Sequence, residues 1–116
     1  MPLFLNLQMK KLFIAPIVFI LLHCAAPIFA DDFQDGLDAA GQGDFKTAFE
    51  KWEPLARRGS ALAQFNLGLM YDKGEGVKRN YSKAVKWYKP AAKQGIASAQ
   101  FNLGELYSKG NGVRQS

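Results

Sequence analysis

The sequence has almost none of the side chains on which most enzyme active sites depend. It contains one cysteine, Cys24, and one histidine, His23, and both fall in an amino-terminal segment that we expect to be removed. From Asp31 onward there is no thiol, no imidazole and no pair of cysteines for a disulfide. Thiol nucleophiles, histidine bases and cysteine–histidine metal sites are therefore excluded there. No Asp or Glu pair recurs in the manner of an acid–base couple, so we expect no enzyme, no cofactor and no metal.

Long apolar runs are also scarce, and the one that exists is short. Eleven apolar residues, Leu12–Leu22, follow Lys10 and Lys11 and lead into small residues that end at Ala30. A cationic start, a short apolar run and a small-residue end are the layout of a secretory signal peptide. The run falls short of the ~20 residues that a membrane span needs. We predict a signal peptide over residues 1–30.

Cleavage between Ala30 and Asp31 would release the rest of the chain outside the cytoplasm. We therefore predict an exported protein, periplasmic or secreted, with no stable membrane span after cleavage. Translation starts at either Met1 or Met9, since the residues before Met9 add nothing to the pattern. Two alternatives stay open, namely an uncleaved membrane anchor and a lipoprotein box that ends at Cys24.

The alternating pattern of a β-strand is absent, and an internal repeat is present instead. The hexapeptide Ala63–Gly68 recurs as Ala99–Gly104, 36 residues later. The same spacing relates Tyr71 to Tyr107. A period between about 20 and 50 residues is typical of stacked supersecondary units.

Each unit has the pattern of two helices. Leu67, Met70 and Tyr71 fall on one helical face, while Asp44 and Asn80 are suitable N-cap residues at equivalent positions. Gly59 and Gly95 are suitable stops. We predict an all-α fold, an α/α solenoid of helix–turn–helix repeats with about five helices after the leader. Their expected ranges are about 32–40, 44–57, 60–73, 80–93 and 96–109.

Two prolines, Pro54 and Pro90, fall inside predicted helices at equivalent positions. Proline removes a backbone donor and costs roughly 3 kcal/mol in a regular helix interior. We therefore expect a kink or break at both positions.

The stretch Ala63–Gly95 resembles a complete Sel-one-like repeat, a relative of the tetratricopeptide repeat whose own period is 34 residues. The resemblance extends over about residues 43–113. It implies a domain over residues 31–116, which we divide into a helix pair, a full repeat and a half repeat, at 31–58, 60–95 and 96–116.

The resemblance implies a protein–protein interaction module or scaffold that binds a protein or peptide partner on the solenoid surface, outside the cytoplasm. The alternative is a cell-envelope enzyme that acts on β-lactams or the cell wall. Some exported members of the family have been linked to β-lactam chemistry, and they are rich in cysteine. This chain lacks those cysteines, so we favour the binding module.

The best candidates for partner contact lie on one face of the helices predicted over 60–73 and 96–109. The two copies of this face share Asn and Lys but differ at the two other positions. A face that varies between copies is less constrained by packing, so it is either a binding surface or neutral solvent-facing surface. Its residues are Leu62, Asn66, Leu69 and Lys73 in the first copy, and Ser98, Asn102, Glu105 and Lys109 in the second.

Charge is distributed unevenly along the mature chain. Residues 31–72 contain eight acids and four bases, whereas residues 73–116 contain nine bases and two acids. The basic half includes Lys78, Arg79, Lys83 and Lys86 beside Trp87, a pattern that also occurs at anion-binding surfaces. We interpret it as a solvated helix face with buried aromatics, and we expect no nucleic-acid partner.

The sequence reaches Ser116 at the point where a third copy of the helix that begins near Asp44 and Asn80 should start. Leu103, Leu106 and Tyr107 would then lack half of the cover that their counterparts have. Exposed apolar patches usually mark contact sites. We expect self-association through residues 96–116, binding of a partner helix there, or continuation in a longer array.

Overall fold

The computed structural model describes residues 27–112 of the 116-residue chain. The chain divides into two compact units, residues 1–31 and 32–116, and the packing described below belongs to the second. The predicted leader lies outside the described residues except for its last four, which are helical. No helix among the described residues is long and apolar enough to cross a membrane.

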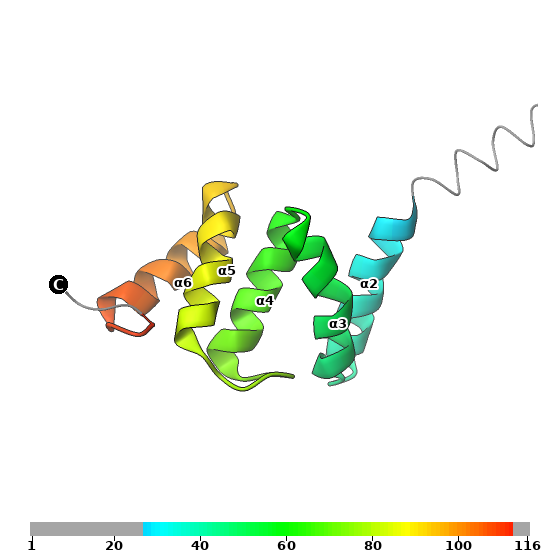
Figure 1. Cartoon of the computed structure of the whole chain (residues 1–116), viewed down its shortest axis with the longest axis horizontal. Helices are drawn as coiled ribbons and strands as arrows, with labels where there is room; N and C mark the ends of the chain where they lie inside the picture. Colours follow the sequence, from blue (N-terminus) through cyan, green and yellow to red (C-terminus); the bar gives the residue numbers. More distant parts are fainter. Residues whose placement is uncertain (1–26, 113–116) are drawn as a thin grey trace, which may run out of the picture. The chain divides into compact units, whose positions relative to one another are not determined.

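Within residues 27–112, five helices follow one another in chain order, and each packs beside the next (Figure 1). The all-α prediction with about five helices is confirmed, and the described part of the chain contains no strand. The helices are α2 (Pro27–Gly41), α3 (Phe45–Arg57), α4 (Ala61–Lys73), α5 (Tyr81–Lys93) and α6 (Ala97–Ser108).

The ends of the helices follow from local chemistry that the sequence displays. The side chains of Asp44 and Asn80 accept hydrogen bonds from the backbone N–H groups three residues later, at 3.2 and 3.0 Å. Each thereby satisfies one of the free donors at a helix start, as predicted. Gly59 and Gly95 follow α3 and α5 with φ of 101° and 95°, in the left-handed region that favours glycine at a helix end.

The first helix begins earlier than expected. It starts at Pro27 rather than near Asp32, because proline is well tolerated in the first turn of a helix, where its missing N–H would have no partner. Asp32 and Asp35 therefore lie beyond the first turn of α2. They lie further along α2, where they face Lys51 of α3 at 3.5 and 4.0 Å.

We expected a kink or a break at the two prolines, and neither helix is broken there. Helices α3 and α5 continue through Pro54 and Pro90 for three further residues. Each proline stands in the last turn, and its carbonyl still accepts a hydrogen bond, from Arg58 N and Gln94 N respectively, both at 3.2 Å. The loss is confined to one backbone donor near the helix end, so the helix is not interrupted.

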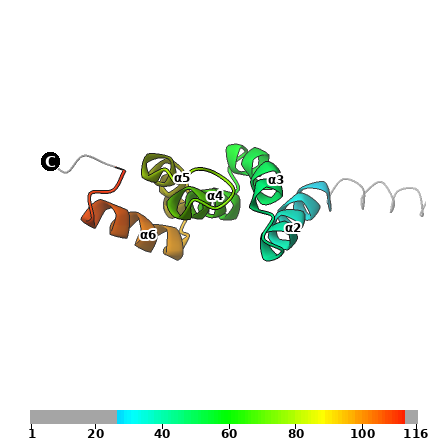
Figure 2. The same ribbon diagram turned by 90° about the horizontal axis from the view of Figure 1, so that it is seen from below.

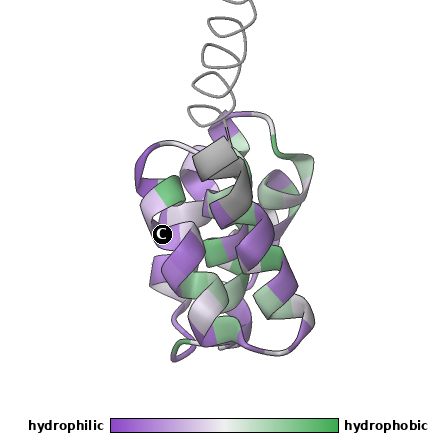
Figure 3. Ribbon diagram, turned by 90° about the vertical axis from the view of Figure 1, so that its right-hand side faces the viewer, coloured by the Kyte–Doolittle hydropathy of each residue, from purple (hydrophilic) through white to green (hydrophobic). Residues whose placement is uncertain are grey.

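Apolar side chains gather in two core clusters. Figure 2 shows the same helices from below, and Figure 3 shows that hydrophobic (green) and hydrophilic (purple) residues are interleaved along them. Trp52 is buried in the first cluster and Tyr88 in the second, 36 residues apart. Helix α4 contributes Leu67 to the first cluster, and Phe65 packs against the second, so this helix joins the two clusters.

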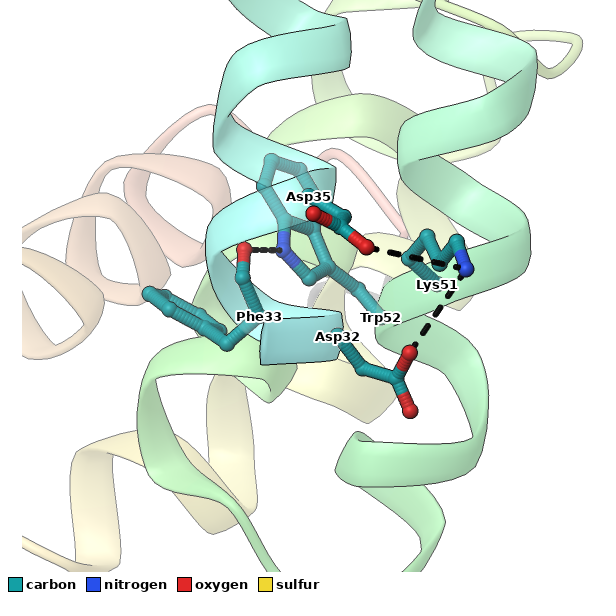
Figure 4. Close-up of polar contacts among 5 residues, drawn as sticks. All are labelled: Asp32, Phe33, Asp35, Lys51 and Trp52. Carbon is teal, nitrogen blue, oxygen red and sulfur yellow. Dashed lines mark hydrogen bonds and ion pairs between the residues drawn. The ribbon is translucent and has the colours of Figure 1, made fainter. Parts of the chain in front are cut away.

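Each of these two rings lies against a glycine of the preceding repeat helix. A Cβ atom on Gly36 of α2 would overlap the Trp52 indole, and one on Gly68 of α4 would overlap the Tyr88 ring. The polar edge of each ring is also satisfied: Trp52 Nε1 donates to Phe33 O at 3.1 Å (Figure 4), and Tyr88 Oη donates to Asp72 Oδ2 at 3.0 Å. We call the space beside such a helical glycine a glycine slot. An aromatic ring fills this slot twice, between α2 and α3 and between α4 and α5.

Candidate functional site

A groove with two adjoining cavities lies between α3 and α5 and beside the loop that follows α4. The larger cavity has a volume of about 480 Å³ and the smaller about 390 Å³, and Tyr71 and Lys83 line both. We call the two together the basic groove. Its aromatic residues are Phe49, Tyr71 and Trp87; its charged residues are Glu53, Arg57, Lys78, Arg79, Lys83 and Lys86.

The aromatic part of the groove is fixed by packing between helices. Phe49 of α3 meets Tyr71 of α4 edge to face, with ring centroids 5.8 Å apart and an angle of 88° between the rings. Trp87 of α5 packs against the first core cluster while one part of it lines the cavity. Edge-to-face pairs of this kind are favourable beyond their buried area, so the groove is formed before any ligand enters.

The charged part is dominated by cations. Five Lys or Arg side chains line the groove against one carboxylate, Glu53. Glu53 pairs with Arg57 one turn along α3, and the Lys83 ammonium lies 5.5 Å from the centre of the Tyr71 ring. Both Lys83 and Lys86 are exposed. The groove therefore carries a net positive charge above an aromatic floor.

The Tyr71 hydroxyl is neutral at physiological pH. Burial, and to a lesser degree the negative charge of Glu53, raise the pKa of Tyr71 above its ordinary value. The hydroxyl is thus available as a hydrogen-bond donor inside the groove and does not act as a base near neutral pH.

The predicted contact residues on α4 have unequal surroundings. Leu62 is 53% exposed and Lys73 is exposed, whereas Leu69 packs against the second core cluster and Asn66 is half-buried. None of the four lines the basic groove. The structure thus leaves Leu62 and Lys73 available at the surface and assigns Leu69 in part to packing.

Their counterparts on α6 divide in the same way. Ser98 is exposed, and Glu105 and Lys109 are exposed and pair with each other at 3.5 Å. Asn102 instead donates from Nδ2 to Tyr88 Oη at 3.4 Å. The role of these eight residues in binding stays a prediction.

Only the half of the basic groove formed by α5 and the loop before it was identified from the sequence. The basic cluster was interpreted as a solvated helix face with buried aromatics, which agrees with exposed Lys86 and with the packing of Trp87 against the first core cluster, but Trp87 also lines the larger cavity. The half on α3 was missed. The available signal was that Phe49 and Glu53, and likewise Lys83 and Trp87, are four residues apart and so share a face on two successive helices of the same type.

No group of three Asp or Glu side chains gathers into a metal-binding cluster within residues 27–112.

Comparison with protein families matches the Sel1 repeat at residues 61–96 and 97–116. The first match covers α4 and α5, and the second begins with α6. This chain carries Sel1 repeats. The resemblance inferred from the recurring hexapeptide is therefore confirmed, and the basic groove lies between the helix before the first Sel1 repeat and the second helix of that repeat.

Solved Sel1-repeat structures have the same fold. A protective antigen from uropathogenic Escherichia coli strains, which displays an SLR fold, is 36% identical with a TM-score of 0.69, over 80% of this chain and 21% of that one. A Sel1 repeat protein from Oxalobacter formigenes is 36% identical with a TM-score of 0.66, over 74% of this chain and 34% of that one.

Curated relatives match over shorter stretches. The DAP3-binding cell death enhancer 1 of Rattus norvegicus is 41% identical over 50 residues, which are 43% of this chain and 10% of that protein. A putative sel1-like repeat-containing protein of Acanthamoeba polyphaga mimivirus is 50% identical over 32 residues, 28% of this chain and 6% of that protein. The matched stretches thus span about a tenth or less of these relatives.

Proposed function

We propose that this Sel1-repeat chain is a non-catalytic binding module that acts outside the cytoplasm and holds a peptide segment of a partner protein in the basic groove. Sel1 repeats generally mediate protein–protein interaction, and the groove supplies a defined place for it. The observation that carries the proposal is the preformed cavity of about 480 Å³ with an aromatic floor and a cationic rim.

The chemistry of the groove selects a partner segment that is acidic and carries an apolar side chain. Lys83 and Lys86 at the rim attract a carboxylate, which mainly raises the association rate and excludes basic segments. Phe49 and Trp87 offer apolar surface in which one aliphatic or aromatic side chain can be buried. Aromatic residues in such positions commonly dominate the binding energy.

A binding role fits the ionisable groups of the groove better than a catalytic one. Its single carboxylate, Glu53, is paired with Arg57. The residues that line the groove include no second acidic group that could complete an acid–base pair. Tyr71 keeps its proton near neutral pH because its pKa is raised. These features support a site that recognises charge and shape.

Export is proposed from the signal-peptide pattern in residues 1–30, since those side chains lie outside the described part of the structure. One solved relative is a protective antigen, which is compatible with a location outside the cytoplasm. The partner would then be an envelope or extracellular protein.

The test is a pull-down from an envelope extract with the full chain and a matched pair of charge variants. Lys83→Glu with Lys86→Glu reverses two charges at the groove. Lys89→Glu with Lys93→Glu makes the same change at exposed positions of α5 outside both cavities. We expect one stoichiometric partner with the wild type and with the second pair, and its loss with the first.

Other results would revise the proposal. Retention of the partner by the groove variants and its loss on Leu62→Asp would move the contact to the α4 face. Turnover of a wall or β-lactam substrate by the purified chain, abolished by Glu53→Gln, would replace the binding module with the enzyme alternative.

A further inference from the structure

The glycine slot that recurs in the core is filled twice and is open a third time. Trp52 fills the slot at Gly36, and Tyr88 fills the slot at Gly68. Gly104 on α6 is the repeat equivalent of Gly68, and a Cβ placed there would meet nothing within 4 Å. The slot on α6 is therefore present in the backbone and empty of any described side chain.

An aromatic ring suited to such a slot is exposed on the same helix. Phe101 is 68% exposed, although its repeat equivalent Phe65 packs against Tyr88 with ring centroids 6.0 Å apart. Among the described residues, the large aromatic side chains that are exposed are Phe101 and Tyr107, and both belong to α6. Sequence reasoning anticipated an apolar α6 face, but wrongly included Leu106, which is buried in the second core cluster.

We propose that α6 packs against α6 of a second copy about a two-fold axis, with the Phe101 ring of each copy in the Gly104 slot of the other. Phe101 and Gly104 are three residues apart on α6. Two antiparallel copies of α6 can therefore each place the Phe101 ring in the slot of the other, which makes two equivalent contacts. A contact made by the same patch on both subunits is the closed, self-complementary arrangement of most homodimers. It extends to a second chain the ring-on-glycine packing that the fold already uses between α3 and α2 and between α5 and α4.

The charges of α6 are compatible with this pairing. When position 101 opposes position 104 of an antiparallel partner helix, Glu105 opposes the uncharged Gln100. Glu105 also remains paired with Lys109 of its own helix. The contact therefore brings no like charges together. It also leaves the basic groove free, because neither Phe101 nor Gly104 lines either cavity.

The sharpest test is a substitution that stabilises the monomer while it fills the slot. Gly104→Ala has open space around the new Cβ and replaces a poor helix former with a good one, so the thermal midpoint of the chain should not fall. The added methyl group occupies the place of the incoming ring. In sedimentation equilibrium of the full chain, we expect Gly104→Ala to weaken dimerisation by roughly tenfold or more, and Phe101→Asp to abolish it.

Cross-linking gives a second, independent readout. In a Cys24→Ser background, a mixture of Phe101→Cys and Gly104→Cys chains should form the mixed disulfide under mild oxidation. The same mixture with Lys93→Cys in place of Gly104→Cys should not. The proposal is overturned if the wild type is strictly monomeric at high concentration, or if Gly104→Ala and Phe101→Asp dimerise as the wild type does. In the latter case the association belongs to another segment, such as residues 1–30, which all variants share.

Discussion

The Tyr88 hydroxyl donates a hydrogen bond of 3.0 Å to Asp72 Oδ2, which joins the middle of α5 to the last turn of α4. The Tyr88 side chain is fully buried, and Asn102 of α6 adds a longer hydrogen bond to the same oxygen, at 3.4 Å. One phenol thus connects three helices through a single polar atom inside an apolar cluster.

Removal of that oxygen should destabilise the fold without a change in shape. Tyr88→Phe keeps the ring in the Gly68 slot but leaves the half-buried Asp72 and Asn102 groups without this partner. We expect a loss of about 1–3 kcal/mol in the free energy of unfolding, measured by urea denaturation. Tyr107→Phe is the control, since Tyr107 is exposed and should change stability by less than ~0.5 kcal/mol. Equal effects of the two variants would contradict the assignment.

The same phenol makes stability depend on alkaline pH. Burial, followed by the charge of Asp72 and its hydrogen bond, raises the pKa of Tyr88 well above the usual 10.0. Above pH 10 the unfolded chain releases this proton and the folded chain keeps it. The folded state then binds more protons, so the free energy of unfolding falls as pH rises, by up to ~1.4 kcal/mol per pH unit for this group. Tyr88→Phe should flatten the slope between pH 10 and 11.5, and an unchanged slope would show that other groups cause it.

Buried Gln64 should matter more than its repeat equivalent. Gln64 is 5% exposed, donates to Ala56 O at 3.1 Å and accepts from Gln94 Nε2 at 2.9 Å. Gln64→Leu removes both hydrogen bonds, although Ala56 O keeps its hydrogen bond from Gly59 N at 3.0 Å, and the expected cost is about 1–2 kcal/mol. Gln100 makes the corresponding bond to Ala92 O at 3.0 Å but is exposed, so Gln100→Leu should cost much less. The free energies of unfolding of both variants, measured by chemical denaturation, test this difference.

The turn after α4 requires glycine for two reasons. Gly76 has φ of 74°, and a Cβ there would lie 2.7 Å from the carbonyl carbon of Phe45. Gly43 has φ of 80° with open space around it. Gly76→Val should therefore lose ~1–3 kcal/mol from backbone strain and a similar amount from overpacking, whereas Gly43→Val loses the strain alone. Thermal midpoints that fall equally would show that Phe45 can move aside.

Processing at the amino terminus can be read from the mass of the exported protein. Cleavage after Ala30 predicts a chain that begins at Asp31. This position lies inside α2 (Pro27–Gly41), so the cut would remove the first residues of that helix. Recovery from membranes of a chain that retains Lys10–Leu22 would contradict the prediction and support the anchor alternative.

Most of the fold could be predicted because its determinants are local. The caps at Asp44 and Asn80, the helix ends at Gly59 and Gly95 and the 36-residue period all act within a few residues or by simple repetition. Of the kink or break expected at Pro54, the break does not occur, because the cost of proline applies to a helix interior and Pro54 stands in the last turn.

The basic groove could not be predicted in full, because it depends on how two helices of the same type are placed relative to each other. Phe49 and Trp87 are 38 positions apart, and nothing in the sequence fixes the distance between α3 and α5. The exposed Phe101 shows the same limit, since its counterpart Phe65 is covered by a ring that belongs to the following helix.

The two tryptophans of the chain occupy different environments. Trp52 is 4% exposed inside the first core cluster, whereas Trp87 lines the basic groove. The protein therefore carries two intrinsic fluorophores with separate duties. We expect emission from Trp52 to report loss of the core, and emission from Trp87 to change when the proposed partner segment enters the groove. A Trp87→Phe chain isolates the Trp52 signal, and the difference from the wild type gives the contribution of Trp87, so folding and the proposed binding can each be followed optically without an attached dye.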